Sequence, residues 1–194
     1  MRKVTASLFS TLDGVVEAPN EWQFAFDDEM GAAMSRMLDE LDVVLLGRVT
    51  YTEWAAYWPT STDEPFASWI NHTPKYVASS TLDSVDQWSN SALIKGSVAD
   101  FVAELRQQKG GTIGTGGSPS LVRWLFDQGL LDELTLLIHP VVAGGGRKRL
   151  FADDAALTKL ELVESQPTSS GVIIRDLPAS TVTAPPYASV GPVV

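Results

Sequence analysis

The residues best suited to chemistry lie in a glycine-rich run at positions 110–121. The run has the pattern of a short buried strand, a turn at Gly116 and Gly117, and a helix that begins at Ser118 and Pro119. Serine at the N-cap and proline at the first helical position favour a helix start. Glycines let backbone N–H groups approach a ligand, and the helix N-terminus adds partial positive charge. The run therefore predicts a seat for a phosphate or pyrophosphate, with a plain strand-to-helix turn as the alternative.

A second candidate anion site follows another apolar run. Gly47 is followed by Arg48, which with Thr50 puts a guanidinium and a hydroxyl at the start of a predicted helix. A cation and a hydroxyl at a helix N-terminus form a good receptor for a dianionic phosphate. The hydroxyls of residues 79–81 follow the next strand, and Lys95 could add charge nearby. A surface ion pair and a simple strand cap are the alternatives.

Other residues could serve a substrate. Asp13 lies in an Asp-Gly turn, and Asp28 lies in the first turn of a predicted helix, where a carboxylate also complements the helix dipole. Trp22 and Trp54 belong to an aromatic concentration on which a flat heterocycle could stack, although core packing would also explain them. Arg147 begins a basic triplet that could hold an anionic substrate tail or could be solvated surface charge.

The elements that must position these residues alternate between strand and helix patterns for most of the chain. Such alternation, closed by terminal strands, predicts an α/β fold with a mixed sheet and helices on both faces. The predicted strands are Val4–Leu12, Val43–Gly47, Lys75–Ser79, Ala92–Lys95, Thr112–Thr115, Glu133–Val142, Leu160–Gln166 and Gly171–Leu177. The predicted helices are Asp27–Leu41, Thr50–Tyr57, Ser97–Gln108 and Ser118–Gln128.

Composition narrows the function classes. The 194 residues are 44% hydrophobic, which suits one domain with a sizeable core. A net charge of −10 argues against a nucleic-acid surface, and no segment approaches the ~20 apolar residues of a membrane span. The absence of cysteine excludes disulfides and thiol catalysis and fits a cytoplasmic protein. Two histidines, His72 and His139, cannot build a three-histidine metal site, so we expect no metal and a structural role for His139.

Four motifs in order resemble the dihydrofolate-reductase-like superfamily. They are the segments 10–14, 46–51, 113–118 with Leu121, and 138–146 with Leu150 and Phe151. Within the superfamily, the chain is most similar to the reductase domain of the riboflavin-biosynthesis deaminase–reductase and to its stand-alone relatives. The resemblance covers nearly the whole chain and implies a single three-layer domain over residues 1–177, with a central, mostly parallel sheet and a C-terminal antiparallel strand pair.

The resemblance also implies a function, namely NADPH-dependent hydride transfer to a nitrogen heterocycle such as a pterin or a ribosylated pyrimidine. In the family, the Arg48 position holds the adenosine 2′-phosphate, the glycine turn holds the pyrophosphate and often has a cis Gly–Gly bond, and the first strand flanks the nicotinamide. The cofactor residues implied are Leu8, Phe9, Val16, Gly47, Arg48, Val49, Thr50, Ser79, Ser80, Thr81, Lys95, Gly114, Thr115, Gly116, Gly117, Ser118 and Leu121.

Some expectations stay open at this point. The predicted helix 27–41 has no carboxylate from Met30 to Met37, which favours an alternative function as a non-catalytic nucleotide-, pterin- or flavin-binding module. We expect Asp13 or Asp28 to orient a proton-donating water, and Trp22, Trp54 and Arg147 to contact the substrate. Family habit implies a homodimer. Residues 178–194 form a Pro-, Ala-, Ser-, Thr- and Val-rich tail, which we expect to be pinned against its own domain or a neighbouring subunit.

Overall fold

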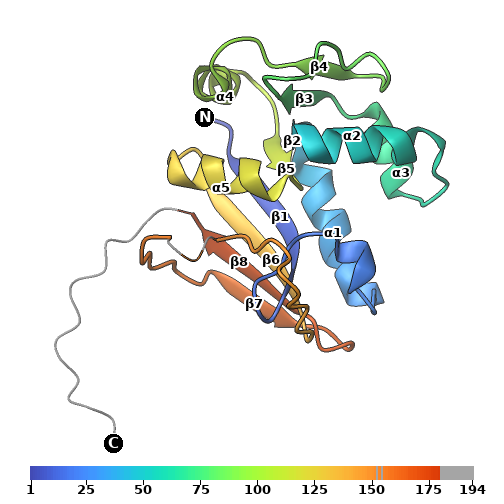
Figure 1. Cartoon of the computed structure of the whole chain (residues 1–194), viewed down its shortest axis with the longest axis vertical. Helices are drawn as coiled ribbons and strands as arrows, with labels where there is room; N and C mark the ends of the chain where they lie inside the picture. Colours follow the sequence, from blue (N-terminus) through green and yellow to red (C-terminus); the bar gives the residue numbers. More distant parts are fainter. Residues whose placement is uncertain (152, 154, 180–194) are drawn as a thin grey trace, which may run out of the picture.

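The computed structural model of the chain describes residues 1–151, 153 and 155–179. Its centre is an 8-stranded sheet in the order β4-β3-β2-β5-β1-β6-β8-β7 (Figure 1). The strands are β1 (Val4–Thr11), β2 (Leu41–Gly47), β3 (Lys75–Ala78), β4 (Ser91–Leu93), β5 (Thr112–Thr115), β6 (Glu133–His139), β7 (Glu164–Pro167) and β8 (Ile173–Pro178). The strands from β4 to β6 in this order are parallel, and β8 is antiparallel to β6 and β7.

Helices cover both faces of the sheet, as predicted. They are α1 (Asp28–Glu40), α2 (Arg48–Tyr57), α3 (Phe66–His72), α4 (Val98–Gln107) and α5 (Pro119–Asp127). Alternating side chains of β2 assign the faces, since Val43 and Leu45 pack with α4 and α5, whereas Val44 and Leu46 pack with α2 and α3. Helix α1 lies on the α2 side, where it packs on β1, β6 and β8. The mixed α/β architecture with a terminal antiparallel pair is thus confirmed.

Local chemistry explains where several elements begin and end. The Asp27 carboxylate accepts from the Met30 N–H at 2.8 Å, and the Ser97 hydroxyl accepts from the Asp100 N–H at 3.2 Å, so each caps its helix. Strand β6 ends at His139 rather than at the predicted residue 142, because Pro140 has no N–H to donate to the ladder.

Sequence patterning missed or misplaced a few elements. Helix α3 has seven residues and too few apolar repeats to show a helical period, and it is stabilised by packing in the cluster around Trp88. Strand β7 begins at Glu164 rather than at Leu160, since the ladder with β8 covers Glu164–Pro167 and is preceded only by the bond from the Val163 N–H to the Asp176 carbonyl oxygen. Strand β8 extends through Pro178, and Ala179 is buried. The rest of the tail, residues 180–194, lies outside the described residues, so the expectation that it is pinned stays a prediction. Over the described ranges, no helix has the length and apolarity that crossing a membrane requires.

The core beside α3 contains an unusual charge, the ammonium group of Lys75 at the start of β3. The residue is 1% exposed, and its Nζ donates to the carbonyl oxygens of Ile70 and Thr73, both at 2.8 Å. It also lies 4.4 Å from the centroid of the Trp88 ring, a cation–π distance. These contacts satisfy its donors, but burial without a carboxylate partner lowers the pKa of Lys75 to about 8.

This buried lysine predicts a pH dependence of stability. Because its pKa is about 8 in the folded protein and 10.5 for an unperturbed lysine, the folded protein releases the proton first as pH rises. The free energy of unfolding should therefore rise between pH 8 and pH 10.5 through this group. Urea unfolding of the wild type and of Lys75→Met at several pH values would isolate the contribution as the difference in slope. Equal slopes in the two proteins would contradict the prediction.

Candidate functional site

Two helix N-termini meet at the carboxyl ends of neighbouring strands. Helix α2 follows β2 and helix α5 follows β5, and these strands are paired in parallel through Val44 and Gly114. The Gly47 N–H donates to the Gly117 carbonyl oxygen at 3.2 Å, which joins the two helix starts. A Cβ on Gly47 would overlap the Ser118 hydroxyl, and one on Gly117 would lie 2.7 Å from Thr50 Oγ1. The contact therefore requires glycine on both sides.

The glycine turn keeps the shape that the sequence predicts, with one difference. The resemblance implies a cis bond between Gly116 and Gly117, whereas the structure has it between Gly117 and Ser118. Gly117 has a φ of +147°. Thr115 is buried, and its hydroxyl donates to the Gly117 carbonyl oxygen at 3.1 Å, which holds the turn against the end of β5.

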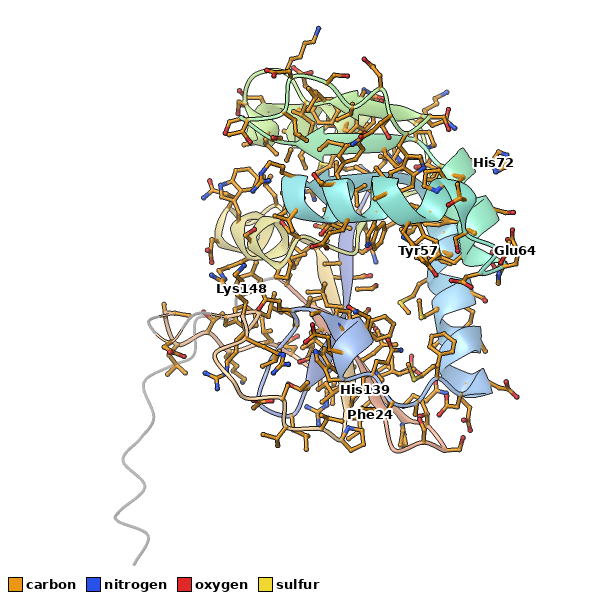
Figure 2. The ribbon with its side chains drawn as sticks, turned by 45° about the vertical axis from the view of Figure 1, so that its right-hand side comes forward. Phe24, Tyr57, Glu64, His72, His139 and Lys148 are labelled. Carbon is orange, nitrogen blue, oxygen red and sulfur yellow. The ribbon has the colours of Figure 1, made fainter. Side chains whose placement is uncertain are left out.

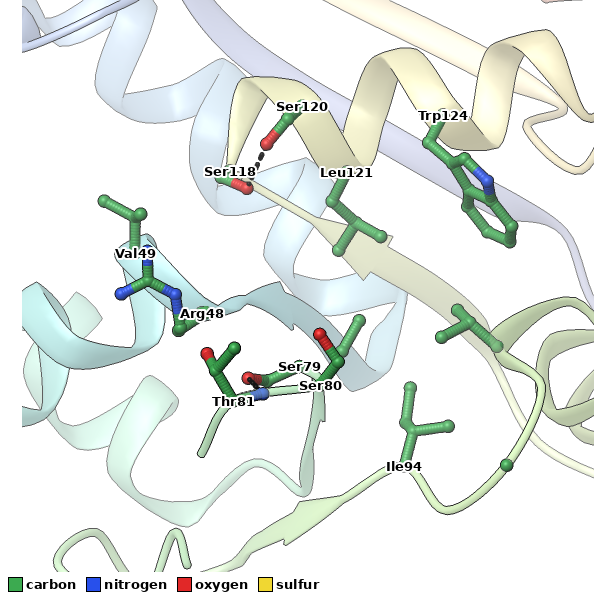
Figure 3. Close-up of a pocket in the computed structure, with 13 residues that line it drawn as sticks. Arg48, Val49, Ser79, Ser80, Thr81, Ile94, Ser118, Ser120, Leu121 and Trp124 are labelled. Carbon is green, nitrogen blue, oxygen red and sulfur yellow. Dashed lines mark hydrogen bonds between the residues drawn. The ribbon is translucent and has the colours of Figure 1, made fainter. Parts of the chain in front are cut away.

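A cavity of about 500 Å³ opens beside these helix starts (Figure 3). It lies across the carboxyl ends of β2, β3 and β4 and the first turns of α5, where ligands bind in parallel α/β sheets. Its lining residues are Arg48, Val49, Ala78, Ser79, Ser80, Thr81, Ile94, Gly96, Val98, Ser118, Ser120, Leu121 and Trp124.

The polar groups of this cavity suit an anion. Five of the lining residues carry hydroxyls, and Arg48 is the single charged one. Arg48 is the first residue of α2, so its guanidinium and the helix N-terminus act on the same region. The Ser79 hydroxyl accepts from the N–H groups of Thr81 and Leu82, both at 3.1 Å, which folds the loop after β3 toward the cavity.

Most of the predicted cofactor residues gather here. Seven of them line the cavity directly, namely Arg48, Val49, Ser79, Ser80, Thr81, Ser118 and Leu121. Gly47, Thr50, Gly114, Thr115 and Gly117 lie in the strand ends and turns behind it. Lys95 is exposed between two lining residues but is not itself part of the lining. Sequence reasoning missed Ala78, Ile94, Gly96, Val98, Ser120 and Trp124. Trp124 could have been found from its helical spacing, because it lies three residues after Leu121.

The first strand continues the site beyond the end of β5. The ladder between β1 and β5 stops at the pair Ala6–Thr115. The Lys3 carbonyl oxygen accepts from β5, whereas the Val4 carbonyl oxygen accepts from Asp132 on the other side. By strand alternation, the backbone groups of Phe9 point to the β5 side, past its end, and those of Leu8 point to β6. Phe9 is therefore better placed than Leu8 to hydrogen bond a ligand.

Gly116 links the cavity to this open edge of β1. It is exposed, and a Cβ there would lie 3.4 Å from Trp54 Cη2 and 3.9 Å from the Ser7 carbonyl oxygen. Trp54 is half-buried, and its ring contacts those of Trp58 and Phe66 edge-on. Val16 is buried, and its N–H donates to the Lys148 carbonyl oxygen at 3.1 Å, so this donor is already engaged.

Several predicted substrate residues have structural partners. Trp22, which we expect from the sequence to contact the substrate, is instead a core side chain: it is 3% exposed, and its indole N–H donates to the Glu17 carbonyl oxygen at 2.8 Å. Loop residues 18–22 fold inward so that the ring packs edge-on against His139, with centroids 5.6 Å apart. Arg147 pairs with Glu21 at 3.0 Å rather than presenting a free guanidinium.

The two candidate catalytic carboxylates differ in their surroundings. Asp13 accepts from the Thr11 hydroxyl at 2.6 Å and from the N–H groups of Ala143 and Gly144 at 3.1 and 2.9 Å. These bonds lower the pKa of Asp13 to about 2, led by that from Thr11, and tie the loop after β1 to the glycine loop after β6. Asp28 is exposed in the first turn of α1. Among the described residues, no group of three or more metal-binding side chains is found.

The strand order and the cavity at the ends of the parallel strands define the class as a dihydrofolate-reductase-like α/β protein. Residues 2–174 match the family model of the RibD C-terminal domain, so the chain belongs to that family. The resemblance inferred from the four motifs is thus confirmed. The chain is also 32% identical over 179 residues to the uncharacterized protein YyaP of Bacillus subtilis. The aligned region covers 89% of this chain and 92% of YyaP.

Two solved structures share the fold. A protein from Shewanella sp. PV-4 assigned to riboflavin biosynthesis matches with a TM-score of 0.74 and 18% identity, over 91% of this chain and 98% of that one. Dihydrofolate reductase from Enterococcus faecalis, complexed with NADP(H) and RAB-propyl, matches with a TM-score of 0.60 and 14% identity, over 90% and 93%. At these identities, the matches show the common fold.

The close contact of the two helix starts predicts a strong effect of one added methyl group. In Gly47→Ala, the new Cβ must displace the Ser118 hydroxyl, so we expect the free energy of unfolding to fall by about 1–3 kcal/mol, as for an overpacked core. Gly31→Ala is the control, since a Cβ at Gly31, near the start of α1, meets Phe26 at an ordinary 3.5 Å and should raise stability through helix propensity. Urea unfolding measures both, and an unchanged midpoint for Gly47→Ala would contradict this account.

Proposed function

We propose that the protein is an NADPH-dependent reductase that transfers hydride to a flat nitrogen heterocycle. One observation carries the proposal: Arg48 is the single charged residue lining the cavity, at a helix N-terminus, in a chain of net charge −10. A free cation in an acidic protein, surrounded by hydroxyls, suits a bound phosphate group. Membership of the RibD C-terminal domain family and a fold neighbour complexed with NADP(H) support the same cofactor.

The cavity lining differs in polarity from one part to another, and each part would bind a different group of NADPH. Arg48 and the hydroxyls of Ser80 and Thr81 would hold the adenosine 2′-phosphate. The start of α5, with Ser118 and Ser120, would hold the pyrophosphate through the helix N-terminus. The adenine would lie against the apolar side of the cavity, formed by Ile94, Val98, Leu121 and Trp124.

The open edge of β1 would receive the nicotinamide. The backbone N–H and C=O of Phe9 lie beyond the last β5 pair and match the donor and acceptor of a carboxamide. Because Gly116 has no side chain, the part of the cofactor that joins the pyrophosphate to the nicotinamide could pass between Trp54 and Ser7. The bound cofactor would supply the hydride, and the protein would position it and exclude water.

The proton source is a separate part of the proposal. Asp13 is held by three donors, which fixes its carboxylate and keeps it ionised at neutral pH, so it would orient a water rather than give up a proton itself. Asp28 is exposed, and it could orient a water only with the substrate in place. A non-catalytic nucleotide- or heterocycle-binding module is the second candidate, favoured by the absence of any carboxylate on the buried face of α1. Oxidation of NADPH with any heterocycle would exclude this second candidate.

Removing the guanidinium tests the cofactor assignment. In Arg48→Ala, we expect NADPH affinity to fall about 10- to 100-fold, the size of a lost charge-assisted hydrogen bond, while NADH affinity changes less than about twofold. Calorimetric titration with both nucleotides measures the difference. Arg36→Ala removes the same charge from an exposed position on α1 and should leave both affinities unchanged. Equal NADPH affinity in the wild type and Arg48→Ala, or no binding of either nucleotide, would overturn the proposal.

A further inference from the structure

The sheet face beneath α1 stays accessible at its central strand. Strand β1 lies between β5 and β6, where a helix-covered strand is normally buried. Ser7 and Phe9 of β1 point to the α1 side, and both are only half-buried. Trp54 of α2 and Gly116 adjoin Ser7 at the end nearest the cavity. Solvent therefore reaches β1 next to the position proposed for the nicotinamide.

Methionine forms the opposite side of this opening. Apart from Met1, every methionine of the chain lies on α1, at positions 30, 34 and 37. Met30 is fully buried, whereas Met34 and Met37 are half-buried, and Met37 Sδ accepts from the Ser7 hydroxyl at 3.2 Å. In Figure 2, the sulfur atoms of α1 lie on the side of the helix that faces the strands. We call Met34, Met37, Ser7 and Phe9 together the methionine wall.

The methionine wall carries no charge. A titratable side chain in contact with it is His139, which is 1% exposed and packs edge-on between Phe9 and Trp22, at centroid distances of 5.7 and 5.6 Å. Figure 2 shows His139 beside the lower end of α1. Burial lowers the pKa of His139, an effect partly opposed by the charge of Asp27, so its ring is neutral at physiological pH. The wall is thus built from polarisable and aromatic groups.

The cations of the neighbouring loop are already paired. Arg147 pairs with Glu21 at 3.0 Å, and Lys148 pairs with Glu17 at 3.1 Å. Arg149 donates to the Asp13 carbonyl oxygen at 2.8 Å. On α1 itself, Arg36 is exposed and lies about 100° around the helix from Met37. Among the described residues, the substrate side thus has no counterpart of Arg48.

We propose that the methionine wall binds an uncharged, planar heterocycle and that the site rejects phosphorylated substrates. This inference rests on the proposed function, whose substrate side it defines. A flat ring stacks on Phe9 and on the methionine sulfurs, whose flexible side chains adapt to different ring outlines. A phosphate on the same ring finds no free cation and meets the carboxylates of residues 27–29, so it loses hydration without a partner. The same reasoning predicts that several uncharged ring systems bind.

Riboflavin and FMN test the proposal, because they differ only by one phosphate. Each is titrated into the full-length protein saturated with NADP⁺, which cannot reduce them. We expect riboflavin to bind at least tenfold more tightly than FMN. Equal binding, tighter binding of FMN, or no binding of riboflavin to the NADP⁺ complex would overturn the proposal.

A pair of variants locates the binding. Met37→Glu places a carboxylate in the wall and should weaken riboflavin binding at least tenfold without changing NADP⁺ affinity. Ser35→Glu adds the same charge to an exposed position of α1 and should change neither affinity. Unchanged riboflavin binding by Met37→Glu would place the ligand elsewhere and overturn the proposal. If Met37→Glu does not fold, the comparison of riboflavin with FMN on the wild type still decides.

The two proposals fail in different ways. Absence of NADP⁺ binding overturns the reductase function, and riboflavin and FMN titrated without cofactor then still report on the wall. NADP⁺ binding with a preference for FMN over riboflavin leaves the cofactor assignment intact and overturns only the substrate class.

Discussion

The site depends on one steric constraint, the contact between the starts of α2 and α5. Strands β2 and β5 are neighbours, so the chains that leave them must turn away within the same small volume. Gly47 and Gly117 allow this, because a Cβ on either would collide with Ser118 or Thr50. The hydrogen bond between the two glycines then directs two helix N-termini toward one cavity. The partial charges of the two helices add there, and Arg48 supplies a full charge.

The two halves of the site use opposite electrostatics. The cavity that we propose for the cofactor is lined by one charged residue, Arg48, and by several hydroxyls, in an otherwise acidic protein. The methionine wall, which we propose for the substrate, presents sulfur and aromatic groups instead, and the cations of the neighbouring loop are paired with Glu17 and Glu21. Under the proposed function, a ligand with phosphates and a ligand without them would be directed to different ends of the same site. This division would separate the binding of the cofactor from the choice of substrate.

Two carboxylates near the candidate site, those of Asp13 and Asp27, have structural roles in this fold. The Asp13 carboxylate joins the loops after β1 and β6, and Arg149 donates to its carbonyl oxygen, so the residue holds two site loops in register. Asp27 caps α1 and also accepts from the Ser170 N–H at 2.9 Å, which fixes the helix against the turn before β8. The two Asp27 contacts thus help to position α1 over the sheet face that includes β1.

The sequence by itself determined the α/β alternation, the helix starts near Asp27 and Ser97, and the glycine turn, because these follow from local periodicity and hydrogen bonding. It also carried the family motifs, which include four of the residues that line the cavity, and the hydroxyl run 79–81, which supplies three more. The burial of Trp22 and the pairing of Arg147 with Glu21 were decided only by the tertiary structure, since each depends on segments far apart in the chain. The same holds for the open edge at Phe9, which exists because β5 ends before β1 does. Local patterns specify elements, whereas the ends of neighbouring strands specify which groups stay free for a ligand.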